Sequence, residues 1–313
     1  MGSPAGPMGA IPGGPRGEIV ALKGLDLDVH EGEFFGLLGP NGAGKTTTIG
    51  ILTTRVKPTS GSALVGGADV SSDAVRVRQR IGVVPQRPNP DRSLNVIENL
   101  LFHAAYFDIP ASASLPRANA LLEQLAIADK AHSKVDEMSG GQQQRLMIAR
   151  ALIHEPQVIF LDEPTVGLDP QTRLSLWQIL RELHAEGRTI VMTTHYMEEA
   201  DKLCDRIAII DRGELLELDT PDALKQRAPG GTLVEISVSG DAGALVDRVR
   251  ALDGVLRAEG QGQMLRVYSD RGGRVISPVI AVVEDGGATV TNISLTEPSL
   301  ETLFVSRTGR KLD

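Results

Sequence analysis

The stretch GPNGAGKTT at positions 39–47 constrains the fold of this 313-residue chain more than any other segment. It follows the apolar run FFGLL at 34–38 and opens a helical pattern, which is the strand-to-helix context of a phosphate-binding loop. Its glycines let backbone N–H groups turn toward phosphate oxygens, and the helix N-terminus adds favourable partial charge. The nucleotide-binding residues predicted from this stretch are Gly39, Pro40, Asn41, Gly42, Ala43, Gly44, Lys45, Thr46 and Thr47. Of these, Lys45 brings a full positive charge to the outer phosphates, and Thr46 offers its hydroxyl to Mg²⁺.

A second apolar run, VIFL at 158–161, ends in two adjacent carboxylates, Asp162 and Glu163. Open α/β sheets bind their ligands at the carboxyl ends of the strands, so these side chains are expected beside the phosphate-binding loop. We expect Asp162 to join Thr46 in the Mg²⁺ shell, and Glu163 to orient or deprotonate the attacking water. The two motifs together predict a hydrolase that acts on a Mg²⁺-bound nucleotide.

The first two thirds of the chain alternate short apolar runs with longer helical patterns, which predicts an α/β domain with a largely parallel sheet. The strand-like runs lie at 34–38, 81–84, 158–161, 189–194 and 206–210. Segments near 18–29 and 61–70 have the character of antiparallel edge strands. Residues 95–153 are predicted to be mostly helical, with Asn95 and Glu98 as an N-cap pair.

A shift in composition at 228–231 marks a linker, and the segments after it predict a second domain. Their order is βαββαβ, which suggests a ferredoxin-like α+β domain closed by a helix at 298–306. The predicted organisation is therefore a flexible Gly- and Pro-rich tail at 1–17, an α/β domain at 18–228 and an accessory domain at 229–313.

The net charge, the cysteine count and the apolar content of the chain limit which partners and which cellular location are expected. The net charge of −8 and the pI of about 5.4 argue against nucleic acid as the main partner. The single cysteine, Cys204, cannot form an internal disulfide, which fits the reducing cytoplasm. No window approaches the run of about 18 apolar residues that a membrane-spanning helix needs, so the chain is not expected to cross a bilayer.

The segment MSGGQQQR at 138–145 resembles the signature sequence of the ATP-binding cassette (ABC) family. The resemblance implies that this segment grips the γ-phosphate of ATP bound to the other protomer, so that ATP joins two copies head to tail. The residues implied in this contact are Ser139, Gly140, Gly141 and Gln142.

Further landmarks of that family follow in the expected order, and the resemblance assigns a role to each. Gln86 contacts Mg²⁺ and water and relays to a membrane partner, Asp169 lines the dimer interface, and His195 contacts the γ-phosphate. With Glu163, Gln86 and His195 form the implied catalytic set. The implied fold at 18–225 is a P-loop NTPase cassette with a mostly parallel sheet core, an antiparallel β subdomain and a helical subdomain.

One family feature is replaced in this sequence. Family members usually carry an aromatic ring upstream of the phosphate-binding loop to stack on adenine, but residues 1–33 contain no Phe, Tyr or Trp. Arg16 stands where that ring would align, and a guanidinium can also stack on a base. Arg16 is therefore predicted to contact the nucleotide.

Three segments, GEFFGLLGPNGAGKTT, DRSLNVIENLLFHAAYF and TEPSLETLFVSRTG, resemble the export ATPases of the daunorubicin-resistance type. This resemblance implies a homodimer on the cytoplasmic face of the cell membrane. It would power the export of small amphipathic molecules or lipids through a separate membrane-spanning subunit.

The alternative is a soluble ABC ATPase of translation or DNA maintenance. Members of those classes carry two cassettes or long coiled-coil insertions, whereas here only 94 positions (139 minus 45) separate Lys45 from Ser139. A nucleotide-binding regulator without turnover would be expected to lack Glu163 or His195, and both are present.

Overall fold

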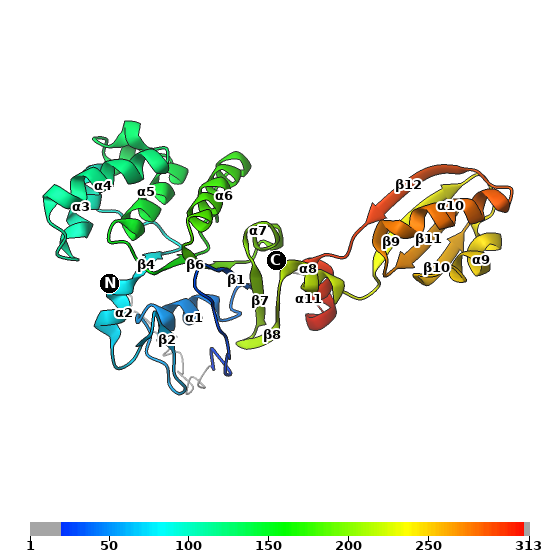
Figure 1. Cartoon of the computed structure of the whole chain (residues 1–313), viewed down its shortest axis with the longest axis horizontal. Coiled ribbons are helices and arrows are strands. Elements are labelled where there is room, and N and C mark those ends of the chain that lie inside the picture. Colours follow the sequence, from blue (N-terminus) through cyan, green and yellow to red (C-terminus); the bar gives the residue numbers. More distant parts are fainter. Residues whose placement is uncertain (1–19, 310–313) are drawn as a thin grey trace, which may run out of the picture.

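The structure, a computed structural model, describes residues 20–309 and is organised around a six-stranded sheet (Figure 1). The strand order is β4-β5-β6-β1-β7-β8, in which β8 runs antiparallel to β7 and the other neighbours are parallel. The strands are β1 (Phe34–Leu38), β4 (Ile81–Val84), β5 (Val158–Asp162), β6 (Thr189–Thr194), β7 (Arg206–Asp211) and β8 (Glu214–Asp219). The predicted, mostly parallel sheet is confirmed. Its central strands are buried on both faces, which explains their continuous apolar sequences.

Helices cover both faces of this sheet, and three of them form a group of their own. That group, the predicted helical subdomain, consists of α3 (Val96–Ala105), α4 (Ala111–Gln124) and α5 (Gly140–Leu152), which pack on one another (Figure 1). The other helices of this domain are α1 (Lys45–Leu52), α2 (Ala74–Arg80), α6 (Pro170–Ala185), α7 (Met197–Leu203) and α8 (Pro221–Gln226). The predicted cap of α3 is present, because Asn95 and Glu98 exchange side-chain and backbone hydrogen bonds of 2.7 and 2.8 Å.

The segments predicted as antiparallel edge strands are less regular than their sequences suggest. Residues 20–29 form no strand, although Leu25 and Leu27 pack against the core while Asp26 and Asp28 face solvent. The segment near 61–70 contains only a two-residue pairing of β2 (Leu64–Val65) with β3 (Ala68–Asp69). The apolar residues Leu25 and Leu27 therefore pack toward the core although the backbone around them has no ladder partner.

The accessory domain has the predicted βαββαβ order and a core of its own. Its sheet has the order β10-β11-β9-β12, with antiparallel neighbours throughout, as a ferredoxin-like arrangement requires. Its elements are β9 (Thr232–Val238), α9 (Val246–Arg250), β10 (Val255–Gln261), β11 (Met264–Ser269), α10 (Ile276–Asp285) and β12 (Val290–Thr296). Its hydrophobic cluster shares no residue with the two clusters of the cassette.

The last helix, α11 (Leu300–Thr308), does not close the accessory domain as predicted. It returns to the cassette and packs against α7 and α8 (Figure 1). Leu300, Leu303 and Phe304 are buried within the larger cassette cluster. The amphipathic pattern of 298–306 correctly indicated one buried face, but a pattern of this kind does not identify the surface that covers it. We propose that the accessory domain spans 232–296 and is inserted between α8 and α11.

Because Phe304 is fully buried, we expect Phe304→Ala to lower the free energy of unfolding of the cassette by about 3–5 kcal/mol. Phe102→Ala is the matched control, since Phe102 is 54% exposed and its loss should cost less than about 1 kcal/mol. Chemical denaturation followed through Trp177, the single tryptophan of the chain, reports on the cassette. Equal losses in the two variants would contradict the docking of α11.

Candidate nucleotide-binding site

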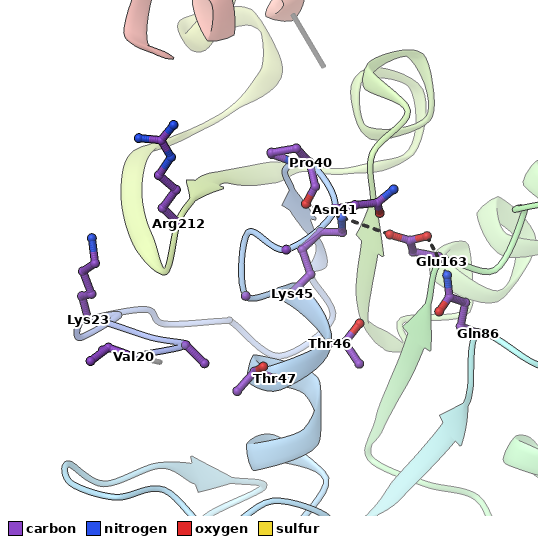
Figure 2. Close-up of a pocket in the computed structure, with 13 residues that line it drawn as sticks. Val20, Lys23, Pro40, Asn41, Lys45, Thr46, Thr47, Gln86, Glu163 and Arg212 are labelled. Carbon is purple, nitrogen blue, oxygen red and sulfur yellow. Dashed lines mark hydrogen bonds and ion pairs between the residues drawn. The ribbon is translucent and has the colours of Figure 1, made fainter. Parts of the chain in front are cut away.

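A cavity of about 480 Å³ lies at the carboxyl ends of β1, β4 and β5 (Figure 2). This volume suits a small-molecule ligand. The lining residues are Val20, Ala21, Lys23, Pro40, Asn41, Gly42, Gly44, Lys45, Thr46, Thr47, Gln86, Glu163 and Arg212. The structure thus places most of the predicted phosphate-binding loop, together with two of the three predicted catalytic residues, around one opening.

The loop between β1 and α1 has the conformation that its sequence predicted. Gly44 precedes α1 with a φ of 110°, a left-handed value that glycine adopts without steric cost. A Cβ at this position would lie 2.6 Å from Leu22 Cδ2, so the packing also excludes a larger residue. The first turn of α1 contains no acidic residue, which leaves its N-terminus free to attract an anion.

Lys45 and Glu163 form a buried ion pair at the inner end of the cavity (Figure 2). Lys45 Nζ lies 3.0 Å from Glu163 Oε1 and donates to the carbonyl oxygens of Gly39 at 2.6 Å and Pro40 at 3.1 Å. Both side chains are nearly inaccessible to solvent. The cation that is predicted to bind phosphate is therefore paired directly with the predicted catalytic base.

The second carboxylate oxygen of Glu163 faces the other two predicted catalytic residues. Gln86 Nε2 donates to Glu163 Oε2 at 3.0 Å (Figure 2), and His195 Nδ1 lies 3.4 Å from the same oxygen without a hydrogen bond. Glu163 has a φ of 48°, which is strained for a residue with a side chain. Its backbone N–H donates to Thr193 Oγ1 at 2.9 Å and is 3.1 Å from Thr193 O, so β6 holds this conformation.

The predicted Mg²⁺ ligands provide one hydroxyl, one amide and one carboxylate. Asp162 is buried and accepts a 2.7 Å hydrogen bond from Thr193 Oγ1, while Thr46 lines the cavity at the start of α1. Within residues 20–309, no group of three or more His, Cys, Asp or Glu side chains is arranged to hold a metal. An oxygen set with a single carboxylate fits Mg²⁺, which keeps water and phosphate oxygens as its other ligands.

Thr193 is a site residue that the sequence reasoning missed. Its hydroxyl accepts from the Glu163 backbone and donates to Asp162, so it orients both carboxylate residues at the end of β5. The available signal was the pair of threonines, Thr193 and Thr194, that ends the strand β6 (TIVMTT), and Thr193 is fully buried in the structure. Buried hydroxyls require a partner, and the adjacent strand end carries one.

A second group of missed residues borders the cavity on the other side of the loop from Glu163 and Gln86. Val20, Lys23 and Arg212 lie there (Figure 2). The turn between β7 and β8 positions them, because Gly213 N donates to Ala43 O at 2.9 Å and Gly213 O accepts from Lys23 N at 2.8 Å. Residues so distant along the chain carry no local motif. Arg16, the residue predicted to stack on adenine, lies outside the described residues.

The predicted signature residues do not line the cavity of their own chain. Ser139 caps α5, accepting from Gln142 N at 3.3 Å, while Gln142 Oε1 accepts from Ser139 N at 2.9 Å. Gly141 lies so close to α6 that a Cβ there would be 2.2 Å from Thr172 Cγ2. Ser139 and Gly140 are exposed, so this helix N-terminus is accessible to a ligand carried by another molecule.

Asp169 is also outside the cavity and caps α6. Its carboxylate accepts from Thr172 N at 3.0 Å and from Thr172 Oγ1 at 2.6 Å. These hydrogen bonds, that from the Thr172 side chain foremost, lower the pKa of Asp169 and keep it ionised. The residue therefore fixes the end of the segment that leads from Glu163 into α6.

Comparison with known proteins agrees with this geometry. A family model described as ABC transporter matches residues 22–166. The Nod factor export ATP-binding protein I of Burkholderia orbicola (strain AU 1054) is 41% identical over 296 residues, covering 95% of this chain and 94% of that protein. The chain belongs to the ABC transporter family. It is an ATP-binding subunit and an ATPase of that family.

A second relative and a solved structure are also similar to this chain. The daunorubicin resistance ATP-binding protein DrrA2 of Streptomyces coeruleorubidus is 41% identical over 304 residues, covering 95% of this chain and 93% of that protein. A solved dimeric ATP-binding cassette in a post-hydrolysis state, bound to ADP and Pi, matches with a TM-score of 0.59 and 31% identity. This match covers 64% of the present chain and 90% of the solved one. The cassette fold and the resemblance to daunorubicin-resistance ATPases are thereby confirmed.

No helix in the described part of the chain combines the length and apolar character needed to span a bilayer.

The buried Lys45–Glu163 pair predicts that, without nucleotide, a double variant is more stable than the single variant that lacks Lys45. Lys45→Ala leaves a buried carboxylate without its cation, so we expect the free energy of unfolding to fall by about 3 kcal/mol. The double variant Lys45→Ala/Glu163→Gln removes the unpaired charge and should recover at least about half of that loss. Chemical denaturation of the three proteins measures the difference.

Lys23→Ala is the matched control for this prediction. Lys23 forms an exposed ion pair with Glu214 at 2.9 Å, and losing such a pair should cost less than about 1 kcal/mol. If the double variant were less stable than Lys45→Ala, the carboxylate would not be the source of the destabilisation.

Proposed function

We propose that this chain is the ATP-hydrolysing subunit of an exporter whose membrane-spanning part is a separate polypeptide. The observation that carries the proposal is the convergence of Lys45, Gln86 and His195 on Glu163 beside a nucleotide-sized cavity. The similarity to export and resistance ATP-binding proteins along 95% of the chain supports the transport role.

The proposed chemistry divides between binding and activation of water. Lys45 and the N-terminus of α1 bind the phosphates, and Glu163 orients the attacking water and accepts its proton. Gln86 and His195 position the Glu163 carboxylate relative to the γ-phosphate. In the structure both side chains already lie close to Glu163 Oε2. Thr46, Gln86 and Asp162 are proposed to hold Mg²⁺, which when bound neutralises phosphate charge. Arg16 remains our prediction for the contact with adenine.

The proposed active form is a homodimer in which each ATP is held between two copies. Ser139 and Gly140 are exposed at the N-terminus of α5 and absent from the cavity of their own chain, so they are available to phosphate bound by another copy. The similar solved cassette is itself dimeric. Asp169 is proposed to lie at the interface between the copies.

The proposed location is the cytoplasmic face of the cell membrane, bound to the permease rather than inserted in lipid. The proposed cargo is a small amphipathic molecule or a lipid, and its selection belongs to the membrane subunit. Copurification of a multi-spanning membrane protein with the tagged chain is the direct test of this partnership.

We expect Glu163→Gln to reduce ATP turnover by about 100-fold or more, because the amide cannot accept the proton of the attacking water. ATP binding should persist, and ATP should then trap a dimer detectable by sedimentation. Lys45→Ala is the contrasting variant, since losing a charge-assisted phosphate contact should weaken binding by about 1.5–3 kcal/mol. Wild-type turnover by Glu163→Gln would refute the assignment of the base.

The accessory domain is proposed to brace this dimer rather than to perform chemistry. Ending the chain at Pro229 would also remove α11 from the cassette core, so the appropriate variant replaces 232–296 with a short flexible linker. We expect this protein to bind ATP normally but to dimerise more weakly in the Glu163→Gln background, as measured by sedimentation with ATP. Equal dimer affinity would exclude the brace. A small molecule that stabilises only the full-length protein would favour a sensor instead.

A further inference from the structure

Unsatisfied buried polar atoms gather around one carboxylate behind the nucleotide site. Seven buried side-chain nitrogen or oxygen atoms in residues 20–309 have no hydrogen-bond partner. Three of them, Thr165 Oγ1, Arg173 Nε and Glu199 Oε2, belong to the Glu199 carboxylate or to residues that act on it. Native structures leave few such atoms, so a local group of donors and acceptors requires an explanation.

Glu199 lies at the centre of this group and is fully buried on α7. Its Oε1 accepts a 3.0 Å hydrogen bond from Trp177 Nε1 of α6, the helix packed beside α7 (Figure 1). Burial raises the pKa of the Glu199 carboxyl, while the hydroxyls of Thr194 and Thr165, the Trp177 N–H and the Arg173 charge act in the opposite direction. We call Thr165, Arg173, Trp177, Thr194 and Glu199 the Glu199 cluster.

The Glu199 cluster connects the two segments that flank the catalytic residues. Thr165 is two positions after Glu163 in the segment that leads to Asp169, and Thr194 immediately precedes His195. Thr194 Oγ1 also accepts a 2.9 Å hydrogen bond from Tyr196 N, which fixes the turn that presents His195. The buried Glu199 carboxylate therefore interacts with a residue close in sequence to Glu163 and with the residue that precedes His195.

A row of neighbouring side chains extends the connection to His195 itself. The Arg173 guanidinium carbon lies 5.8 Å from the Trp177 ring centroid and 5.4 Å from that of Tyr196. The Tyr196 ring in turn is 4.2 Å from the His195 ring. A movement of α6 that shifts Trp177 or Arg173 is thus passed to the histidine through direct contacts.

We propose that Glu199 is a positioning residue for hydrolysis, which couples the 163–169 segment to the His195 turn because its Oε2 accepts a hydrogen bond from the Thr165 hydroxyl. Thr165 Oγ1 and Glu199 Oε2 are a complementary donor and acceptor: the Thr165 hydroxyl already acts on the Glu199 carboxyl, but both atoms are buried and neither has a hydrogen bond of full geometry. Their hydrogen bond reaches full geometry when nucleotide draws Glu163 and His195 together on the phosphate. Trp177 holds the other oxygen and keeps the carboxylate aimed in both states. The inference rests on the proposed roles of Glu163 and His195.

The primary test is steady-state hydrolysis by full-length Glu199→Gln. This substitution keeps the size of the side chain and an acceptor for Trp177, but removes the charge and replaces one acceptor oxygen with a donor. We expect kcat to fall by about tenfold or more while KM for ATP changes by less than about twofold, because the phosphate-binding loop is untouched. Glu198→Gln, an exposed neighbour on the same helix, is the matched control and should retain wild-type kcat.

Thr165→Val tests the partner atom directly. The isosteric change removes the hydroxyl, so it should lower kcat by a similar factor, and combining it with Glu199→Gln should add little further loss. Independent, multiplicative losses in the double variant would overturn the proposed hydrogen bond. Melting temperatures measured in parallel separate positioning from folding: a loss of kcat that disappears when the variant is assayed at lower temperature indicates a structural role and overturns the proposal.

Trp177 supplies a readout that does not depend on turnover, because it is the single tryptophan of the chain and contacts Glu199 directly. Adding ATP to Glu163→Gln should shift its emission, and Glu163→Gln/Glu199→Gln should bind ATP without that shift. An identical shift in both proteins would overturn the coupling. If the wild-type chain hydrolyses no ATP, the proposed function fails; if it does and Glu199→Gln keeps its full rate, only the present inference fails.

Discussion

The ion pair between Lys45 and Glu163 is the interaction on which the arrangement of the nucleotide site depends. Removing two charges from water is costly, and an isolated pair often fails to recover that cost. Here both partners have additional contacts: Lys45 with two loop carbonyls, and Glu163 with Gln86. These partners come from β1, β4 and β5, so the pair links the carboxyl ends of three strands whose order the sheet already sets.

The Lys45 cation has two alternative partners in this site, the Glu163 carboxylate and a bound phosphate. While Lys45 contacts Glu163, the carboxylate that is proposed to activate water is engaged, and phosphate is the ligand chemistry that competes for the lysine. The left-handed backbone of Glu163 places its side chain in this position and is held by Thr193. A strained backbone supported by an adjacent strand is typical of residues whose orientation matters more than local stability.

The sequence was sufficient to predict which of the proposed site residues lie together, because parallel strands end at a common edge. The phosphate-binding loop, Gln86, Glu163 and His195 each follow a different strand, so their convergence required only the correct fold. The contribution of Arg212 and Val20 could not be predicted, since it arises from a backbone hydrogen bond between Lys23 and Gly213, which are 190 positions apart (213 minus 23). Nor did local patterns reveal that Thr193 serves two carboxylate residues, or that residues 20–29 lack a strand partner.

The return of α11 to the cassette changes how the accessory domain is able to move. A domain appended to a chain end is held by one linker and tumbles about it, whereas this one is held at two places, before β9 and after β12 (Figure 1). Two tethers that start from neighbouring helices, α8 and α11, suppress tumbling and leave mainly a hinge-like rotation about the line between them. A displacement of the accessory domain is then transmitted through α11 to α7, the helix that follows His195.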